Sequence, residues 1–85
     1  MDKDKEYRVY FGKSLRELRI KTGKSLRMFA YEYDIPCATL SRIENGTRNA
    51  QLTILKKISE GFGMSFGNFI SAIEKNMPII TLKDE

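Results

Sequence analysis

The side chains best suited to bind another molecule follow Pro36, where small residues and one arginine stand at helical spacing: Cys37, Ala38, Thr39, Ser41 and Arg42. The planar guanidinium of Arg42 can donate two hydrogen bonds to O6 and N7 of a guanine, and Ala38 can contact the methyl group of a thymine. Leu40 and Ile43 would point the opposite way, into a core. A short helix with this division of faces predicts direct reading of base edges in the DNA major groove. For Arg42, a hydrogen bond to a phosphate or a surface ion pair stays an alternative to base contact.

The basic residues of the chain are concentrated around the same segment. The sequence has 15 lysines and arginines and 11 acidic residues, a net charge of +4. Eight of the basic residues but only four of the acidic ones lie between Lys13 and Arg48, whereas residues 1–12 and 49–85 are each balanced. This coincidence with the expected reading helix indicates attraction to phosphates, although a solvated, mildly basic surface would have the same composition.

Two helices are predicted ahead of this segment. Apolar residues at i, i+4 and i+7 indicate a helix from about residue 7 to 21, and Gly23 is placed to end it. Ser25 is a suitable N-cap for a second helix, and Asp34 lies in the turn that follows, where aspartate tolerates a positive φ. Pro36 opens the third helix, at a position where a missing N–H costs little. The residues expected on the buried sides of the first two helices are Phe11, Leu15, Leu18, Phe29, Ala30 and Tyr33.

Two further helices are predicted after it. Asn45-Gly46 is a strong turn signal that ends the third helix. A fourth helix is expected over about residues 52–62, and its inward-facing residues are Leu52, Leu55, Ile58 and Phe62. Ser65 is a suitable N-cap for a fifth helix, which Pro78 stops, and the short apolar segment 79–82 is β-prone. The predicted fold class is all-α, with five short helices around one core.

One continuous pattern extends from position 12 to position 70. Its first part is formed by Gly12, Leu15, Arg16, Leu18, Arg19, Gly23, Ser25 and Ala30. Its second part is the run Ser41-Arg42-Ile43-Glu44-Asn45-Gly46 with Arg48 and Asn49, followed by Leu52, Leu55 and Ile58. The pattern resembles the Cro/phage-repressor (XRE-type) helix-turn-helix family. The resemblance implies a single compact, five-helix repressor-like domain over residues 1–85, with a helix-turn-helix DNA-binding core at 12–70 and the end of the fifth helix and a short C-terminal extension at 71–85.

The resemblance also implies a role for individual residues. In the family, the first residues of the third helix and one residue a turn later read base edges, and here these are Cys37, Ala38 and Arg42, with Thr39 beside them. Phosphates are held at the start of the second helix and in the loop after the third. Together with Lys24, the phosphate-binding candidates here are Ser25, Arg27, Ser41, Asn45 and Arg48. The residues Arg19 and Glu44 match a structural arginine–glutamate pair that joins the first helix to the third.

Several positions depart from the family pattern. Leu26 stands where relatives commonly carry a glutamine that donates to phosphate, and Asp34 stands where they commonly carry glycine. Cys37 and Ala38 offer little hydrogen bonding for base reading. These departures motivate an alternative function, in which the helix-turn-helix scaffold is a protein-interaction module, such as an antitoxin or anti-repressor, without specific DNA reading.

A surface for a second copy is predicted from the apolar residues after position 62. A domain of this size can hardly bury all of them alone, and those expected to contact a partner copy are Phe66, Phe69, Ile70, Ile73, Met77, Ile79 and Ile80. A tail that folds back over its own core is the alternative. A dimer would place two reading helices in successive major grooves about 34 Å apart. The expected function is therefore a sequence-specific transcriptional regulator that binds double-stranded DNA as a homodimer on an inverted-repeat operator, as activator or as repressor.

The composition gives little support to an enzyme. The sequence has no histidine, which excludes a histidine-based triad, and its single cysteine, Cys37, excludes an internal disulfide and a cysteine-ligated zinc site. No glycine-rich phosphate loop is present. We therefore expect no catalytic residue, no metal and no cofactor, and a cytoplasmic protein without membrane contact. Regulation would then come through concentration, dimerisation or a regulatory protein partner.

Overall fold

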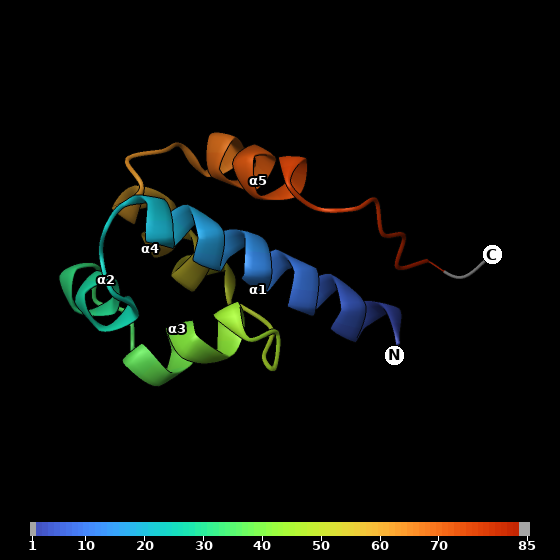
Figure 1. The fold of residues 1–85 in the computed structure, drawn as a ribbon, viewed down its shortest axis with the longest axis horizontal. Coiled ribbons are helices and arrows are strands. Elements are labelled where there is room, and N and C mark those ends of the chain that lie inside the picture. Colours follow the sequence, from blue (N-terminus) through green and yellow to red (C-terminus); the bar gives the residue numbers. More distant parts are fainter. Residues whose placement is uncertain (1, 84–85) are drawn as a thin grey trace.

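Helix α1 (Lys3–Lys21) is the longest helix of the structure (Figure 1). The computed structural model describes residues 2–83, in which five α-helices and no strand occur. The other helices are α2 (Leu26–Glu32), α3 (Cys37–Glu44), α4 (Leu52–Gly61) and α5 (Phe66–Lys75). Helices α3 and α5 pack against α1 on its opposite sides, whereas α2 packs against α3 and α4 packs against α5 (Figure 1). The all-α class with five helices is confirmed; residues 84 and 85 of the expected C-terminal extension lie outside the described residues.

The amino-terminal end of α1 lies earlier than the apolar spacing predicted. The helix begins at Lys3 rather than near Tyr7, because Asp2 is its N-cap and accepts a hydrogen bond from the backbone N–H of Lys5 at 2.7 Å. This hydrogen bond lowers the pKa of the Asp2 carboxyl. Two more acidic side chains lie in the first turn, where negative charge interacts favourably with the helix dipole. These charged residues carry no apolar period, so the spacing gave no sign of the extra turn.

The other helix boundaries follow the caps and turns that the sequence contains. Side-chain oxygens of Ser25 and Ser65 accept backbone N–H groups at the starts of α2 and α5, as predicted. Gly23 and Asp34 adopt positive φ angles of 79° and 57° at the two predicted turns. Pro36, however, precedes α3 instead of opening it, because its ψ of 130° is extended and not helical.

A single apolar core lies between the helices. Its buried members are Leu15, Phe29, Ala30, Ile35, Leu40, Ile43, Ile54, Ile58, Phe69 and Ile73. The ring of Phe62 lies between those of Phe29 and Phe69, with centroid distances of 5.0 and 5.9 Å, so α2, the end of α4 and α5 share one aromatic cluster. Within residues 2–83, every buried side-chain nitrogen and oxygen atom has a hydrogen-bond partner. The helices therefore meet without a polar defect between them.

Two expectations about the carboxy-terminal half are wrong, and a β-prone segment forms no strand. Leu52 does not face inward and is 70 % exposed, because the buried face of α4 is set by Ile54 and Ile58, on the other side of that helix. Residues 79–82 form no strand, since no neighbouring segment pairs with them. Phe69 and Ile73 cannot contact a second copy: both are 0 % exposed and fill the core of their own chain.

Helix α1 and the end of α3 approach so closely that only glycine fits between them. A Cβ atom on Gly12 would lie 2.3 Å from the carbonyl oxygen of Ile43 and 2.4 Å from that of Glu44. From the other element, a Cβ atom on Gly46 would lie 2.6 Å from the Cα atom of Val9. The two backbones are therefore in direct contact, and this contact sets how deeply α3 sits against α1.

The variant Gly12→Ala is expected to destabilise the fold by about 1–3 kcal/mol, because the added methyl group must push the last carbonyls of α3 away from α1. Gly67→Ala is the matched control. Nothing lies within 4 Å of a Cβ atom at position 67 of α5, so alanine there should be neutral or stabilise the helix by up to about 1 kcal/mol. Urea unfolding followed by circular dichroism measures both effects. Equal unfolding free energies for Gly12→Ala and wild type would contradict the backbone contact.

Candidate nucleic-acid interface

Helices α2 and α3 form a pair that is joined by the tight turn 33–36. In this turn the backbone N–H of Ile35 donates to the carbonyl of Ala30 at 2.9 Å, and the side chain of Ile35 is buried. The positive φ of Asp34 reverses the chain direction. On α2 itself, Phe29 and Ala30 are almost completely buried. The pair is thus held together by its own apolar side, and its other side is left to solvent.

The outer face of α3 is polar and open. Leu40 and Ile43 are 1 % and 3 % exposed and hold the inner face of the helix in the core. On the outer face lie all of the residues predicted to read bases, of which Cys37, Ala38 and Arg42 are exposed and Thr39 is half-buried. No carboxylate of residues 2–83 forms an ion pair with Arg42. Its guanidinium therefore keeps its donors for a ligand.

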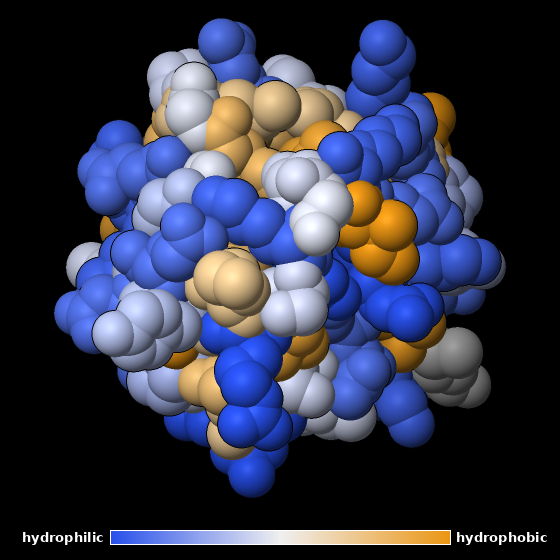
Figure 2. All heavy atoms as spheres, turned by 60° about the vertical axis from the view of Figure 1, so that its left-hand side comes forward, coloured by the Kyte–Doolittle hydropathy of each residue, from blue (hydrophilic) through white to orange (hydrophobic). Residues whose placement is uncertain are grey.

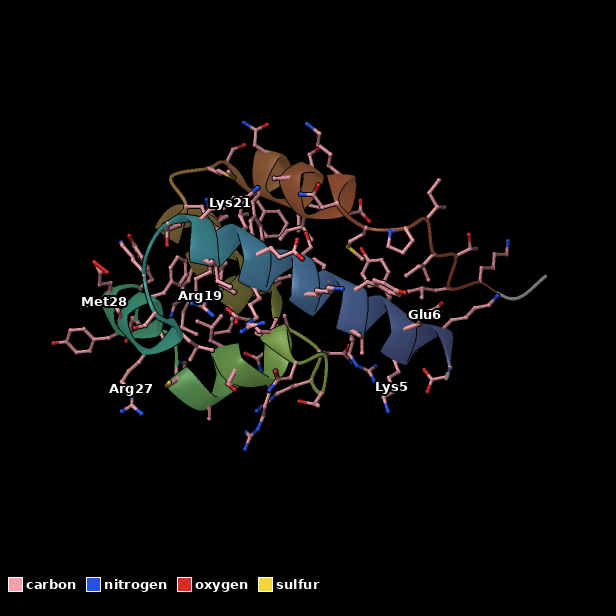
Figure 3. All side chains as sticks on the ribbon, in the orientation of Figure 1. Lys5, Glu6, Arg19, Lys21, Arg27 and Met28 are labelled. Carbon is pink, nitrogen blue, oxygen red and sulfur yellow. The ribbon has the colours of Figure 1, made fainter. Side chains whose placement is uncertain are left out.

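The residues predicted to bind phosphates lie toward both ends of α3. Arg27 is exposed on α2, and its side chain extends on the side of the amino-terminal end of α3 (Figure 3). Ser25, whose oxygen caps α2, precedes it by two residues. At the other end, Asn45 and Arg48 are exposed in the segment that follows α3, and Ser41 is half-buried on α3 itself. A duplex in contact with α3 would therefore meet polar or basic groups on both sides of the groove.

Lys24, also predicted to bind phosphate, is engaged within its own chain. Its Nζ lies 3.2 Å from a carboxylate oxygen of Glu32, donates to the hydroxyl of Tyr33 at 3.1 Å and lies 5.0 Å from the centroid of that ring. The hydrogen bonds to Tyr33 and to Glu32 raise the pKa of Lys24. Lys24 thus ties the start of α2 to its end, and a phosphate at this place competes with Glu32 for the ammonium group.

A buried ion pair joins α3 to α1. Nε and Nη2 of Arg19 donate to the two carboxylate oxygens of Glu44 at 2.7 and 3.0 Å, and Nη1 donates to the backbone carbonyl of Lys24 at 2.9 Å. The two paired side chains are only 9 % and 2 % exposed. The hydrogen bonds to Glu44 raise the pKa of Arg19. Because the paired groups are planar and meet at two points, the last turn of α3 has one orientation on α1.

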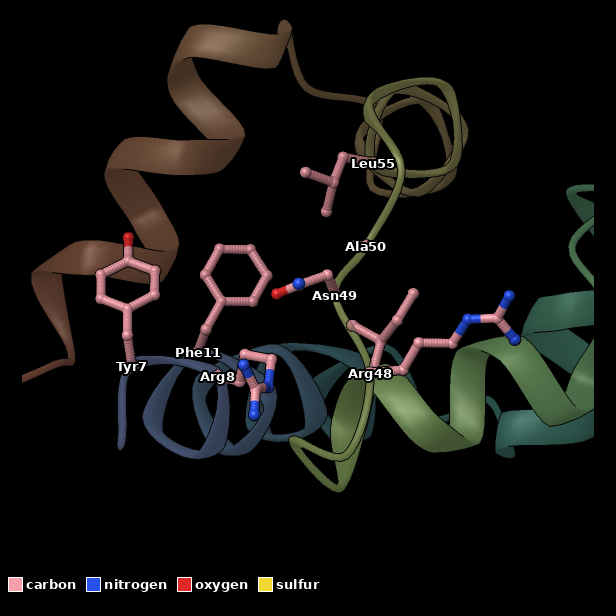
Figure 4. Close-up of a pocket in the computed structure, with 8 residues that line it drawn as sticks. Tyr7, Arg8, Phe11, Arg48, Asn49, Ala50 and Leu55 are labelled. Carbon is pink, nitrogen blue, oxygen red and sulfur yellow. The ribbon is translucent and has the colours of Figure 1, made fainter. Parts of the chain in front are cut away.

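Arg8 is a residue near the interface that the sequence patterns did not single out. Its Nε donates to the carbonyl of Gly46 at 3.3 Å, which brings the side chain beside the loop after α3. From there Arg8 borders a largely apolar cavity of about 250 Å³ together with residues of that loop (Figure 4). The cavity is lined by Tyr7, Arg8, Phe11, Ile43, Arg48, Asn49, Ala50 and Leu55. Residues four apart share a helix face, and Gly12, four residues after Arg8, faces α3 in the structure; the sequence alone did not show which element this face meets.

Another concave surface within residues 2–83 lies between α2, the turn after it and α4, and its polar lining residues are Asp34, Gln51, Thr53 and Lys57, with Tyr31 beside them. No group of three or more histidine, cysteine or acidic side chains within that range could hold a metal ion. The helices of the described chain are too short or too polar to cross a bilayer. At the end of the molecule formed by α2 and α4, hydrophilic side chains cover most of the surface and apolar ones are scattered (Figure 2). The outer face of α3 is the surface on which the residues predicted to read bases come together.

A two-helix unit that presents its second helix in this way, between polar and basic groups, is the arrangement of helix-turn-helix DNA-binding domains. A family model described as helix-turn-helix matches residues 15–69, and the chain belongs to this family. It is a DNA-binding transcriptional regulator of the Cro/phage-repressor (XRE) type, and the family is not one of enzymes. The class of function implied by the sequence pattern is therefore confirmed.

Two curated relatives and one solved structure are similar over most of the chain. Control protein C.MunI of Mycoplasma sp is 41 % identical over 71 residues, which are 82 % of this chain and 96 % of the relative. Control protein C.BamHI of Bacillus amyloliquefaciens is 38 % identical over 58 residues, which are 67 % of this chain and 72 % of the relative. The crystal structure of the clp gene regulator ClgR from C. glutamicum matches with a TM-score of 0.70 at 24 % identity, covering 84 % of this chain and 91 % of that one. This last likeness supports the fold alone.

The variant Glu44→Gln is expected to destabilise the protein by about 3–5 kcal/mol, because it leaves the buried guanidinium of Arg19 without a counter-charge. Glu60→Gln is the matched control, since its partner Lys56 lies 3.6 Å away in an exposed pair on α4. That change should alter stability by less than about 1 kcal/mol. Chemical denaturation at low and at high salt separates the two cases. Equal effects of the two substitutions would show that the α1–α3 pair does not hold α3.

Proposed function

We propose that this chain is a control protein similar in role to C.MunI and C.BamHI, which binds an inverted-repeat operator as a dimer and regulates the transcription of restriction–modification genes. The observation that carries the proposal is the outer face of α3, where Cys37, Ala38 and Arg42 are open to solvent while Leu40 and Ile43 are held in the core. An α-helix displayed in this way fits the B-DNA major groove. The protein would act in the cytoplasm, where it blocks or recruits polymerase at the promoter.

Base reading in this proposal depends mainly on Arg42. Its guanidinium is exposed and unpaired within residues 2–83, and its fork matches O6 and N7 of guanine. Ala38 and Cys37 are small, and Ala38 suits contact with a thymine methyl group. Thr39, half-buried at the edge of the face, adds a hydroxyl that can donate or accept. The expected recognition therefore combines one strong hydrogen-bonding contact with apolar contacts.

Phosphate contacts orient α3 in the groove. We assign one DNA strand to Ser25 and Arg27 and the other to Ser41, Asn45 and Arg48, with Lys24 as a weaker contributor, because these groups lie toward opposite ends of α3. Leu26, where relatives commonly carry glutamine, packs against the core instead. Position 26 thus contributes packing and no phosphate donor, so the phosphate contacts at the start of α2 depend on Ser25 and Arg27.

A second copy places two α3 helices on one inverted repeat. Phe66, Ile70, Met77 and Ile80 are half-buried, and Ile79 is 99 % exposed, so these predicted dimer residues keep apolar surface that a partner copy can cover. Leu52, at the start of α4, is another exposed apolar side chain, 70 % exposed, and we include it in the proposed surface. Two-fold symmetry makes the same patch serve both copies. We propose this set, without Phe69 and Ile73, as the dimer surface.

The variant Arg42→Ala is expected to lose about 1–3 kcal/mol of affinity on a duplex selected from a random pool, and to relax the preference at one base pair. Its binding to mixed-sequence duplex should change little. Lys75→Ala is the control, because it removes one positive charge from α5, on the side of α1 opposite α3. Fluorescence anisotropy titrations of all three proteins on both duplexes provide the affinities. A loss of equal size on every sequence would assign Arg42 to the DNA backbone.

The same titrations, repeated between about 50 and 200 mM salt, test the function itself. A protein that neutralises several phosphates loses affinity by orders of magnitude over this range. Binding that is absent, or that is insensitive to salt, would reject the DNA-reading function and favour use of the scaffold as a protein-interaction module.

At micromolar concentration the wild-type protein is expected to sediment as a dimer. The double variant Leu52→Glu/Ile79→Glu should sediment as a monomer, because it buries two carboxylates in the proposed surface. Ile20→Glu is the control. Ile20 is also exposed, at 53 %, but it lies near the carboxy-terminal end of α1, whereas Ile79 shares a pocket with Tyr7 in the amino-terminal half of that helix. A monomeric wild type would contradict the dimer, and a double variant that stays dimeric would contradict the surface.

A further inference from the structure

We propose that Arg8 of α1 is an additional phosphate-binding residue, which extends the backbone contact of the loop after α3 onto the first helix. The ligand is a phosphodiester of the same duplex that α3 reads, so this inference rests on the proposed function. Arg8 lies outside residues 15–69, the part of the chain matched by the helix-turn-helix family model. The contact would thus belong to the amino-terminal turns of α1 and not to the family core.

The position of Arg8 is fixed by the end of α3. Its Nε donates to the carbonyl oxygen of Gly46 at 3.3 Å, and the backbone of Gly46 is pressed against Val9, the next residue of α1. Gly12, one turn further along α1, faces the last carbonyls of α3. The helix face that carries Arg8 is therefore the face that α3 covers. An arginine held in this way loses little conformational freedom when it binds a ligand.

The hydrogen-bonding capacity of Arg8 is only partly used. A guanidinium has five N–H donors, and the bond to Gly46 occupies the one on Nε. The donors on Nη1 and Nη2 match the paired oxygens of a phosphate. Arg8 is half-buried and borders the same cavity as Arg48 and Asn49 (Figure 4). A strand that follows the loop from Asn45 to Asn49 would thus meet a third basic or polar group from α1.

Nearby acidic groups within residues 2–83 form no ion pair with Arg8. The pKa of Asp2 is nevertheless lowered, first by the backbone hydrogen bond from Lys5 and after it also by the charge of Arg8. Asp2 accepts the backbone N–H of Lys5 as the helix cap, and Glu74 accepts the hydroxyl of Tyr7 at 2.8 Å. Glu6 extends on the side of α1 away from α3 (Figure 3). Residues 1–12 have no net charge as a whole, but the side chain that α1 presents to the loop after α3 is the positively charged Arg8.

The test compares Arg8→Ala, Arg8→Lys and Lys21→Ala with the wild type on one duplex selected from a random pool. Lys21→Ala removes the same charge from the same helix, but Lys21 extends on the side opposite α3 (Figure 3). The slope of log K against log salt should become shallower by about 0.9 for Arg8→Ala, as for one lost phosphate. Lys21→Ala should keep the wild-type slope. Arg8→Lys, which retains the charge, should keep most of it.

Ethylation interference on the same duplex supplies a readout that a purely structural role would not change. Arg8→Ala should lose sensitivity at one phosphate next to a phosphate that becomes insensitive in Arg48→Ala. A wild-type slope for Arg8→Ala, with or without reduced stability to urea, overturns the inference while the function of α3 stands. Absence of any salt-dependent binding by the wild type overturns both.

Discussion

The contact between α1 and α3 is the constraint on which the whole interface depends. Arg19 meets both oxygens of Glu44 in a largely water-free position and reaches the backbone carbonyl of Lys24 with its third nitrogen. A buried ion pair adds little net stability compared with apolar packing, but an unmatched charge in the same place is costly. Its value here is geometric, because α3 and the entry into α2 satisfy the three hydrogen bonds in one arrangement. Gly12 permits that arrangement by letting the two backbones touch.

The caps and turns next to an apolar period were the features most predictable from the sequence. Ser25 and Ser65 cap their helices, and Gly23 and Asp34 take positive φ, as their chemistry indicates. The start of α1 was missed because it depends on the side chain of Asp2 and not on an apolar period. Apolar spacing placed Leu55, Ile58 and Phe62 correctly in or against the core, but it also placed Leu52 inside and gave no sign of Ile54. Only the packing of α4 against its neighbours selects Ile54 and leaves Leu52 outside.

Some features of the candidate site could likewise be predicted from the sequence, and others could not. The exposed face of α3 follows from the alternation of apolar and polar residues within eight positions, so the sequence located it. Among the relations between distant segments, the family resemblance implied the pair of Arg19 and Glu44, which the structure shows, and the others were not visible. The contact of Arg8 with Gly46 spans 38 positions, and the engagement of Lys24 with Tyr33 depends on how the chain enters α2. Counting apolar residues after position 62 indicated a surplus, but it could not tell that Phe69 and Ile73 belong to the core.

Few side chains at the start of α3 can form hydrogen bonds with bases. The rigid attachment of α3 to α1 is therefore important for the proposed selectivity. With Cys37 and Ala38 at its start, the helix would, in the proposed function, distinguish bases mainly through Arg42 and through apolar contact. Discrimination at other positions must then come from the shape and stiffness of the duplex, which a protein senses only if its backbone contacts are fixed relative to one another. The α1–α3 contact provides such fixed spacing, because it holds the loop after α3 and the start of α2 to one helix. A recognition helix with few hydrogen-bond donors can thus remain selective. The condition is that the groups proposed to bind phosphates, at the start of α2 and in the loop after α3, keep a fixed distance from one another.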